Sequence, residues 1–254
     1  MKDEEKAACP VADMAQRRLL RNSLKPWSGK GFSLLEINGE VCGFLSVFAE
    51  SDFDVAVTAA SPEVRNALAS QREYGVDISA DHDDSLSFED ESFDVAVLHL
   101  TAHDSATTRK SMDEAIRVAK RGVAVCFWNS LSLPFLLMPA ERKKRFFPLH
   151  NALGIWRRLK ADDSGFVSVA STLFFSVNPP ANSLLARCAR WNACLPFGAW
   201  VVVTVVKHSS RPGTALPLRF SPPPLRPLEP AMEFHKRQSS FFPPDTKMFR
   251  NLSS

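Results

Sequence analysis

The residues whose types and spacing best suit chemistry lie in one stretch near the N-terminus, from Ser33 to Leu45. An apolar run there ends in the carboxylate of Glu36. A short loop containing Gly39 and Gly43 follows, and then an apolar pattern with helical spacing. A strand, a tight turn and a helix in this order form the opening unit of nucleotide-binding α/β domains. The stretch therefore predicts a nucleotide-type ligand beyond the end of the first strand.

Three further side chains could take part in a reaction. His99 and His103 follow an apolar run that is typical of a buried strand, and His103 could remove a proton from an acceptor. Both histidines could instead be ordinary core or surface residues. Their spacing with Asp104 lacks the glutamate of a zinc-protease helix, which disfavours a metal site. Cys42 has no His-plus-acid constellation beside it in the sequence, so we do not expect cysteine catalysis.

The elements that must position these residues alternate along the chain. Strands are expected over 33–38, 54–60, 76–79, 93–100, 123–128, 166–177 and 200–207, and helices over 11–24, 41–51, 61–73, 105–120, 149–160 and 182–194. Strands separated by helices imply a parallel sheet with right-handed crossovers, and the last strand can return antiparallel at the edge. Arg121 and Gly122 are expected to close the helix before the fifth strand. Ligands of such sheets bind at the carboxyl ends of the strands.

The chain length and composition favour one α/β domain with appendages. A chain of 254 residues can bury a full core. No stretch reaches the ~18 uncharged apolar residues of a membrane span, and the charged segment 1–6 lacks the apolar core of a signal peptide. The five cysteines are odd in number and show no C-x-x-C spacing. This favours reduced thiols in a cytoplasm over a disulfide framework.

Composition also sets the expected boundaries. Residues 1–30 form a polar leader and a helix, 31–208 the α/β domain, and 209–254 a tail. Half of the 18 prolines lie in 212–244, so the tail should be disordered or polyproline-like.

Charge is divided unevenly between the two halves. Residues 1–130 carry a net charge of −8, and residues 131–254 carry +11. The basic half could meet an anionic partner, or it could be a solvated face that offsets the acidic half. The basic, aromatic segment 141–160 could lie on an anionic lipid surface. Nothing in the sequence points specifically to nucleic acid.

Four segments, in order, resemble the class I S-adenosylmethionine-dependent methyltransferases, in particular the type 11-like group. Leu34–Ile37 resembles the family's first strand and loop, Ser61–Glu63 the segment after its second strand, and Met112–Gly122 the helix before its fifth strand. Leu86–Val97, LSFEDESFDVAV, is close to the family's LPFEDESFDVVV and is the most specific of the four. The resemblance spans about residues 30–207.

The resemblance implies a fold and a site. The fold is a Rossmann-like, mostly parallel sheet of seven strands with helices on both faces and an antiparallel edge strand. The cofactor would be S-adenosylmethionine, held over the tips of the first, second and fourth strands, with 131–164 covering the substrate. The activity would be methyl transfer to a small-molecule or lipid-like acceptor, with His103 as the candidate base. The candidate cofactor-binding residues that the resemblance implies are Glu36, Asn38, Gly39, Cys42, Asp81, Asp83 and Leu98. By spacing, the position that would meet the adenine is His82, and we favour its neighbour Asp83, with Asp81 second.

The cofactor loop departs from the family's pattern. Asn38, Glu40 and Cys42 stand where the family has glycines, and Ala59 stands where it has a carboxylate for the ribose hydroxyls. A hydrogen bond to a charged group contributes about 1.5–3 kcal/mol, so cofactor binding would be tens to hundreds of times weaker. The alternative is therefore a catalytically inactive methyltransferase-fold protein that serves as a binding or scaffold module. A nicotinamide dehydrogenase is disfavoured because the chain has no G-x-G-x-x-G.

Overall fold

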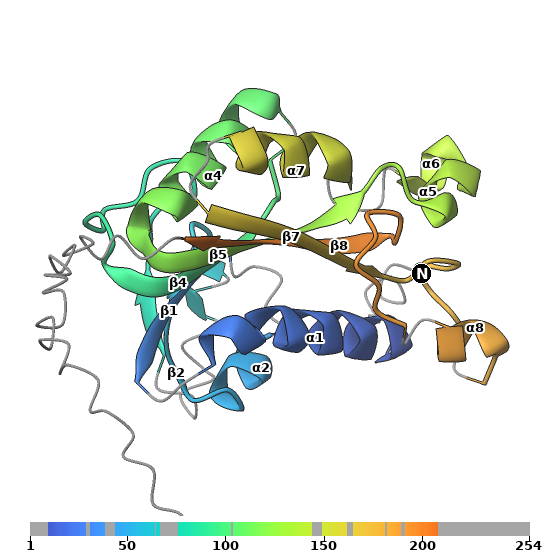
Figure 1. The fold of residues 1–254 in the computed structure, drawn as a ribbon, viewed down its shortest axis with the longest axis horizontal. Coiled ribbons are helices and arrows are strands. Elements are labelled where there is room, and N and C mark those ends of the chain that lie inside the picture. The colour runs from blue at the N-terminus through green and yellow to red at the C-terminus, as the bar shows by residue number, and fades with distance from the viewer. Residues whose placement is uncertain are drawn as a thin grey trace, which may run out of the picture. The chain divides into compact units, whose positions relative to one another are not determined.

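The structure is a computed structural model, and it divides the chain into two units, Met1–Ser210 and Arg211–Ser254. All described residues belong to the first unit, an α/β domain built on one sheet (Figure 1). No helix among them is long and apolar enough to cross a membrane. The described residues are 10–28, 31–38, 44–63, 65–66, 76–102, 104–143, 149–161, 165–180, 182–188 and 191–207.

The strands confirm the predicted fold class. Their order is β3-β2-β1-β4-β5-β8-β7, and β1 to β5 pair in parallel. Strand order reverses at β1, which lies between β2 and β4, and this is where ligands of doubly wound sheets bind. The strand bounds are β1 Phe32–Ile37, β2 Phe53–Thr58, β3 Asp77–Ser79, β4 Phe93–His99, β5 Ala119–Asn129, β6 Leu149–His150, β7 Gly165–Thr172 and β8 Trp200–Lys207.

The antiparallel strand lies one place further in than expected. β8 pairs antiparallel with both β5 and β7, so β7 forms the edge. The side chains explain this order, because the first six residues of β8 are all buried whereas burial along β7 is mostly partial. A strand that is apolar on both faces is most stable inside a sheet. The two-residue strand β6, which pairs with the end of β5, adds an eighth strand to the seven expected.

Helices cover both faces of the sheet (Figure 1). α1, Pro10–Leu24, and α2, Leu45–Ala49, pack on one face, and α4, Ser105–Val118, and α7, Ala152–Ala161, on the other. Successive side chains of a strand point to opposite faces. Leu34 therefore packs under α1 and α2, whereas Leu35 packs under α4 and α7. These are two separate apolar cores, one on each side of the sheet.

One predicted boundary is wrong in an informative way. Arg121 and Gly122 do not close a helix, because α4 ends at Val118 and both residues lie in β5. A Cβ at Gly122 would collide with the ring of Trp27 and with the carbonyl oxygen of Val205. The glycine is therefore needed for close packing within the sheet rather than for a helix end.

Other elements are shorter than the sequence pattern predicts. The helix expected over 149–160 begins at Ala152, because Leu149 and His150 pair with β5. The strand expected over 166–177 ends at Thr172. The remaining elements are the 3-10 helix η1 Lys25–Trp27 and the short helices α5 Leu133–Leu137, α6 Ala140–Lys143 and α8 Leu184–Cys188.

Candidate active site

A buried carboxylate–imidazole pair lies at the carboxyl ends of β1 and β4. Glu36 is fully buried, and its Oε1 lies 3.0 Å from Nε2 of His99, the last residue of β4. β1 and β4 are parallel neighbours with Glu36 opposite Val97, so Glu36 and His99 point to the same face of the sheet. Because a carboxylate oxygen accepts, Nε2 of His99 donates. The fold thus orients the imidazole through Glu36.

Aromatic rings shield this pair from solvent. The ring of Phe44 lies nearly parallel to the imidazole of His99, with 5.3 Å between centroids. Trp200 in turn stacks on Phe44 at 5.7 Å. All three rings are buried in the core under α1 and α2 or at its margin. The stack holds the plane of the imidazole so that Nε2 stays directed at Glu36.

Cys126 is the thiol next to this pair, opposite His99 in β5. Burial raises the pKa of the Cys126 thiol well above its usual range, and the charge of Glu36 raises it further. A protonated, buried thiol is a poor nucleophile. Cys126 therefore acts as a packing residue.

Glu36 keeps one oxygen without a partner. Its Oε2 is buried and accepts no hydrogen bond from the part of the chain that the structure describes. A buried polar atom without a partner costs free energy, and such atoms are rare unless a ligand or water satisfies them. This oxygen belongs to a strand end at the switch point of the sheet, so it is a candidate acceptor for a ligand's donor.

Asn38, the residue after β1, links three parts of the site. Its backbone lies in the left-handed region, with φ of 60°, which asparagine tolerates better than most residues. Its Nδ2 lies within hydrogen-bond distance of Oδ2 of Asp83 at 2.8 Å, the carbonyl oxygen of His99 at 3.1 Å and Oγ1 of Thr101 at 3.1 Å. The amide therefore ties the tip of β1 to the tip of β4 and to the loop after β3.

The two predicted aspartates of that loop are both engaged within the protein. Asp83 accepts from Asn38 and, at 2.9 Å, from Oγ of Ser111 in α4. Asp81 accepts from Ser79 at 2.8 Å and Ser87 at 2.7 Å. Partial burial alone would raise the pKa of Asp81, but these hydrogen bonds outweigh it and hold the pKa below its usual value. Of the two, Asp83 is the one joined to the tips of β1 and β4.

Two positions singled out in the sequence lie in the apolar cores. Leu98 is fully buried under α4 and α7, and Ala59 is fully buried under α1 and α2. The carbonyl oxygen of Ala59 accepts from Nη1 of Arg65 at 3.1 Å. The end of β2 thus offers a methyl group and a neighbouring cation. Gly39, Glu40, Cys42 and His103 lie outside the described residues.

The segment with the most specific resemblance is held by one arginine. Arg117 of α4 donates to Glu114 and Asp90 and to the carbonyl oxygens of Leu86 and Phe88. Hydrogen bonds to these two carboxylates raise the pKa of Arg117 beyond its already high value. In the structure, the segment LSFEDESF forms the loop that leads into β4, and Arg117 docks this loop onto α4.

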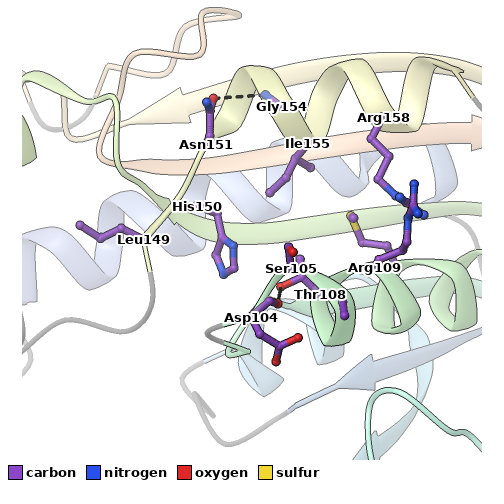
Figure 2. Close-up of a pocket in the computed structure, with 12 residues that line it drawn as sticks. Asp104, Ser105, Thr108, Arg109, Leu149, His150, Asn151, Gly154, Ile155 and Arg158 are labelled. Atoms are coloured by element: carbon purple, nitrogen blue, oxygen red, sulfur yellow. Dashed lines mark hydrogen bonds between the residues drawn. The ribbon is translucent and has the colours of Figure 1, made fainter.

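A cleft of about 620 Å³ lies between α4 and α7, on the opposite face of the sheet from Glu36 (Figure 2). The start of α4, at Asp104 and Ser105, follows the tip of β4, and β6 forms another wall. Arg109 of α4 and Arg158 of α7 both line it, and in Figure 2 their side chains extend toward one another. Two cations in one cleft favour an anionic ligand group.

Arg158 is only partly satisfied. Its Nη2 donates to Oδ1 of Asp113 at 2.8 Å, but its buried Nε has no hydrogen-bond partner among the residues that the structure describes. At the other end of the cleft, the ring of His150 meets Phe127 edge-on. The cleft therefore combines an unsatisfied N–H of Arg158 with a wall formed at the end of β5.

Comparison with known proteins shows what this domain is similar to. Residues 38–127 match the model of a methyltransferase domain. No curated protein matches the chain. Among solved structures, a SAM-dependent methyltransferase of Thermotoga maritima, described as a possible histamine N-methyltransferase, gives a TM-score of 0.57 at 16% identity, over 78% of this chain and 92% of that one.

Two further structures show the same fold. Magnesium protoporphyrin IX methyltransferase of Synechocystis PCC 6803, solved with bound SAH, gives a TM-score of 0.57 at 10% identity, over 79% of this chain and 86% of that one. A plantazolicin methyltransferase, in complex with a pentazolic analogue and SAH, gives a TM-score of 0.52 at 12% identity, over 81% of this chain and 88% of that one. The resemblance is confirmed: residues 38–127 match a methyltransferase domain, and the fold is that of the class I methyltransferases.

The sequence reasoning missed two features of the site. The sequence does not pair His99 with Glu36, although a polar residue that ends an apolar strand beside Glu36 in a parallel sheet is a usable signal. The cleft between α4 and α7 could not be found, because Arg109 and Arg158 are far apart in the chain and no motif links them.

Proposed function

We propose that this protein is an S-adenosylmethionine-dependent methyltransferase whose acceptor is a small molecule, or a lipid-like one, that carries an anionic group. The observation that carries the proposal is Glu36, a buried carboxylate with one unpartnered oxygen at the switch point of a methyltransferase-type sheet. When bound, the cofactor supplies an electrophilic methyl group to a nucleophilic atom of the acceptor.

The residues present fit the charged amino-acid end of the cofactor. Glu36 offers a buried oxygen to an ammonium donor, and the His99 imidazole fixes the carboxylate through its other oxygen. The carbonyl oxygen of His99 and Oγ1 of Thr101 accept from Asn38 at the same strand tip. A ligand amine could replace the Asn38 amide at these acceptors, because both groups donate from nitrogen.

The structure offers fewer contacts to the ribose of S-adenosylmethionine. No carboxylate of the described residues ends β2, where Ala59 is packed in the core. Glu63 is exposed on the turn that follows and is the nearest described carboxylate in sequence. We therefore expect binding weaker by about one to two powers of ten than with a complete ribose contact.

The acceptor would occupy the cleft between α4 and α7. Arg109 and Arg158 would hold its anionic group, and the start of α4 and β6 would place it beside the tips of β4 and β5. Methyl transfer depends mainly on holding the nucleophile in line with the methyl group, so a binding cleft next to the strand ends is the main catalytic requirement.

Calorimetric titration with S-adenosylmethionine and with its demethylated product tests the proposal. We expect dissociation constants in the micromolar to millimolar range, weakened at least about tenfold in Glu36→Gln, because one charge-assisted hydrogen bond is lost. Glu50→Gln, which changes an exposed carboxylate, is the matched control and should bind as the unaltered protein does. No heat with either ligand at millimolar concentration would refute the proposal.

A second candidate, a binding module without turnover, is favoured by the Asn38 contacts. Asn38 already satisfies Asp83, Thr101 and the carbonyl oxygen of His99, which leaves the site internally bonded. If the titrations show no cofactor binding while phosphate still binds at Arg109 and Arg158, this second function is the better one.

A further inference from the structure

Exposed hydrophobic side chains of the described residues are concentrated at one end of the sheet. Twelve large hydrophobic residues are exposed in that part of the chain, and ten of them lie in the segments 131–137 and 175–197. Leu137 of α5 and Leu184 of α8 are the most exposed, at 76% and 74%, and Trp191 is 63% exposed. Exposed apolar side chains concentrated in this way mark an interaction surface.

The two segments meet beyond the carboxyl ends of β5 and β7. Asn129, the last residue of β5, donates through Nδ2 to the carbonyl oxygens of Pro196 at 2.7 Å and Gly198 at 3.1 Å. Its Oδ1 accepts from the N–H of Leu131 at 3.1 Å. Figure 1 shows α5 and α8 at the same end of the sheet. We call the segments 131–137 and 175–197 together the apolar end.

The backbone of the apolar end is fixed from below. Phe135 and Ala186 are buried in the core, and Ser171 of β7 exchanges two backbone hydrogen bonds with Ala193. Thr172 donates through its hydroxyl to the carbonyl oxygen of Trp191 at 3.2 Å. Because these contacts anchor the backbone, the outward leucines and Trp191 are held in the exposed position by the fold.

The sequence of the apolar end and of the residues next to it in the chain is basic. In the sequence, residues 131–145 and 173–199 hold six Lys or Arg and one acid, Glu141. Leucine, phenylalanine and tryptophan together with Lys and Arg are the composition of surfaces that insert into the headgroup region of anionic bilayers. A neutral partner protein would not require this excess of positive charge.

We propose that the apolar end docks on an anionic lipid bilayer, with its leucines and Trp191 in the headgroup region and its basic residues on the lipid phosphates. The inference does not rest on methyl transfer. Docking at this end would turn the carboxyl ends of β5 and β7 toward the lipid. A lipid-like acceptor could then reach the protein without crossing water.

Vesicle co-sedimentation of the full chain tests the docking. We expect binding to vesicles of phosphatidylcholine with phosphatidylglycerol, little binding to phosphatidylcholine alone, and weakening by salt. The double variant Leu136→Ser, Leu137→Ser should have an affinity for the anionic vesicles at least about tenfold lower. Both side chains are exposed, so the substitutions should leave the fold intact. Phe166→Ser is the matched control, because Phe166 is 66% exposed at the opposite end of β7 and should bind as the unaltered protein does.

Tryptophan fluorescence gives a second readout. Trp191 should shift to shorter wavelength on anionic vesicles, and the shift should disappear in Trp191→Phe while sedimentation remains. Three outcomes would overturn the proposal. The first is no binding to either vesicle. The second is equal loss in the Phe166→Ser control. The third is a dimer, broken by the double leucine variant, that ignores vesicles.

Discussion

The two faces of the sheet differ in how far their charged groups are buried. Under α1 and α2, Glu36 is fully buried, oriented by His99 and enclosed by aromatic rings. Between α4 and α7, Arg109 and Arg158 line an open cleft. The first arrangement holds one carboxylate rigidly and leaves its Oε2 for a ligand, whereas the second places two cations, one of them paired with Asp113, along an open cleft. The charge on one face is therefore preorganised by burial, and the charge on the other face lies in an open cleft.

Removing the buried carboxylate should have the largest effect. We expect Glu36→Ala to lower the free energy of unfolding by about 3–4 kcal/mol, because it leaves His99 without a partner and opens a cavity in the core. Glu36→Gln should cost about 1 kcal/mol, since an amide oxygen can still accept from His99. Urea denaturation measures both. A loss in Glu36→Ala no larger than in Glu50→Ala, which breaks the exposed pair with Arg21, would contradict the comparison.

Arg117 should rank second and should depend on pH. Arg117→Ala is expected to cost about 2–3 kcal/mol near neutral pH, because four acceptors lose their donor. Hydrogen bonding to Arg117 holds the pKa of Glu114 below its usual value, so this contribution is full above the unfolded-state pKa of about 4.3 and is lost as pH falls through the lower folded pKa. Denaturation curves between pH 2 and pH 7 measure it. An unchanged difference between variant and unaltered protein across that range would exclude the role of Glu114.

A glycine at Asn38 should sharpen the account of the cofactor site. Asn38→Gly suits the left-handed backbone but removes the side-chain contacts with Asp83, His99 and Thr101, so we expect a loss of stability of about 1 kcal/mol. S-adenosylmethionine should bind about tenfold more tightly, since the acceptors become free. Calorimetry measures this change. Thr101→Val removes one of the three contacts and should have a smaller effect on stability, and weaker cofactor binding in Asn38→Gly would count against displacement of the amide.

The smallest effect on stability is expected in the open cleft. Arg158→Gln should change the free energy of unfolding by less than about 1 kcal/mol, because its partner Asp113 is more than half exposed. With inorganic phosphate as the probe anion, the unaltered protein should melt at higher temperature than in sodium chloride of matched ionic strength, and Arg158→Gln should lose most of that rise. Arg157→Gln, an exposed neighbour on the same helix, is the control. Equal phosphate effects in both variants would remove the cleft as a specific anion site.

The sequence by itself determined the fold class and the elements that carry it. Alternating apolar strands and amphipathic helices have local signals, and Leu86–Val97 adds a twelve-residue match, so the sheet and its switch point could be predicted. Glu36 was also identified, because its position depends on a local pattern, a carboxylate that ends an apolar run before a turn.

Only the tertiary structure decided how the polar groups are used. The partner of Glu36 lies 63 residues away in the sequence. The Asn38 contacts likewise join three strand ends that are far apart in the sequence. β8 lies between β5 and β7 because β8 buries both of its faces and β7 does not. Their order depends on a comparison of the two strands, which neither segment shows alone. The cleft of Arg109 and Arg158 exists only because α4 and α7 pack on the same face of the sheet. Contacts between distant segments leave no local pattern, and for that reason they required the folded chain.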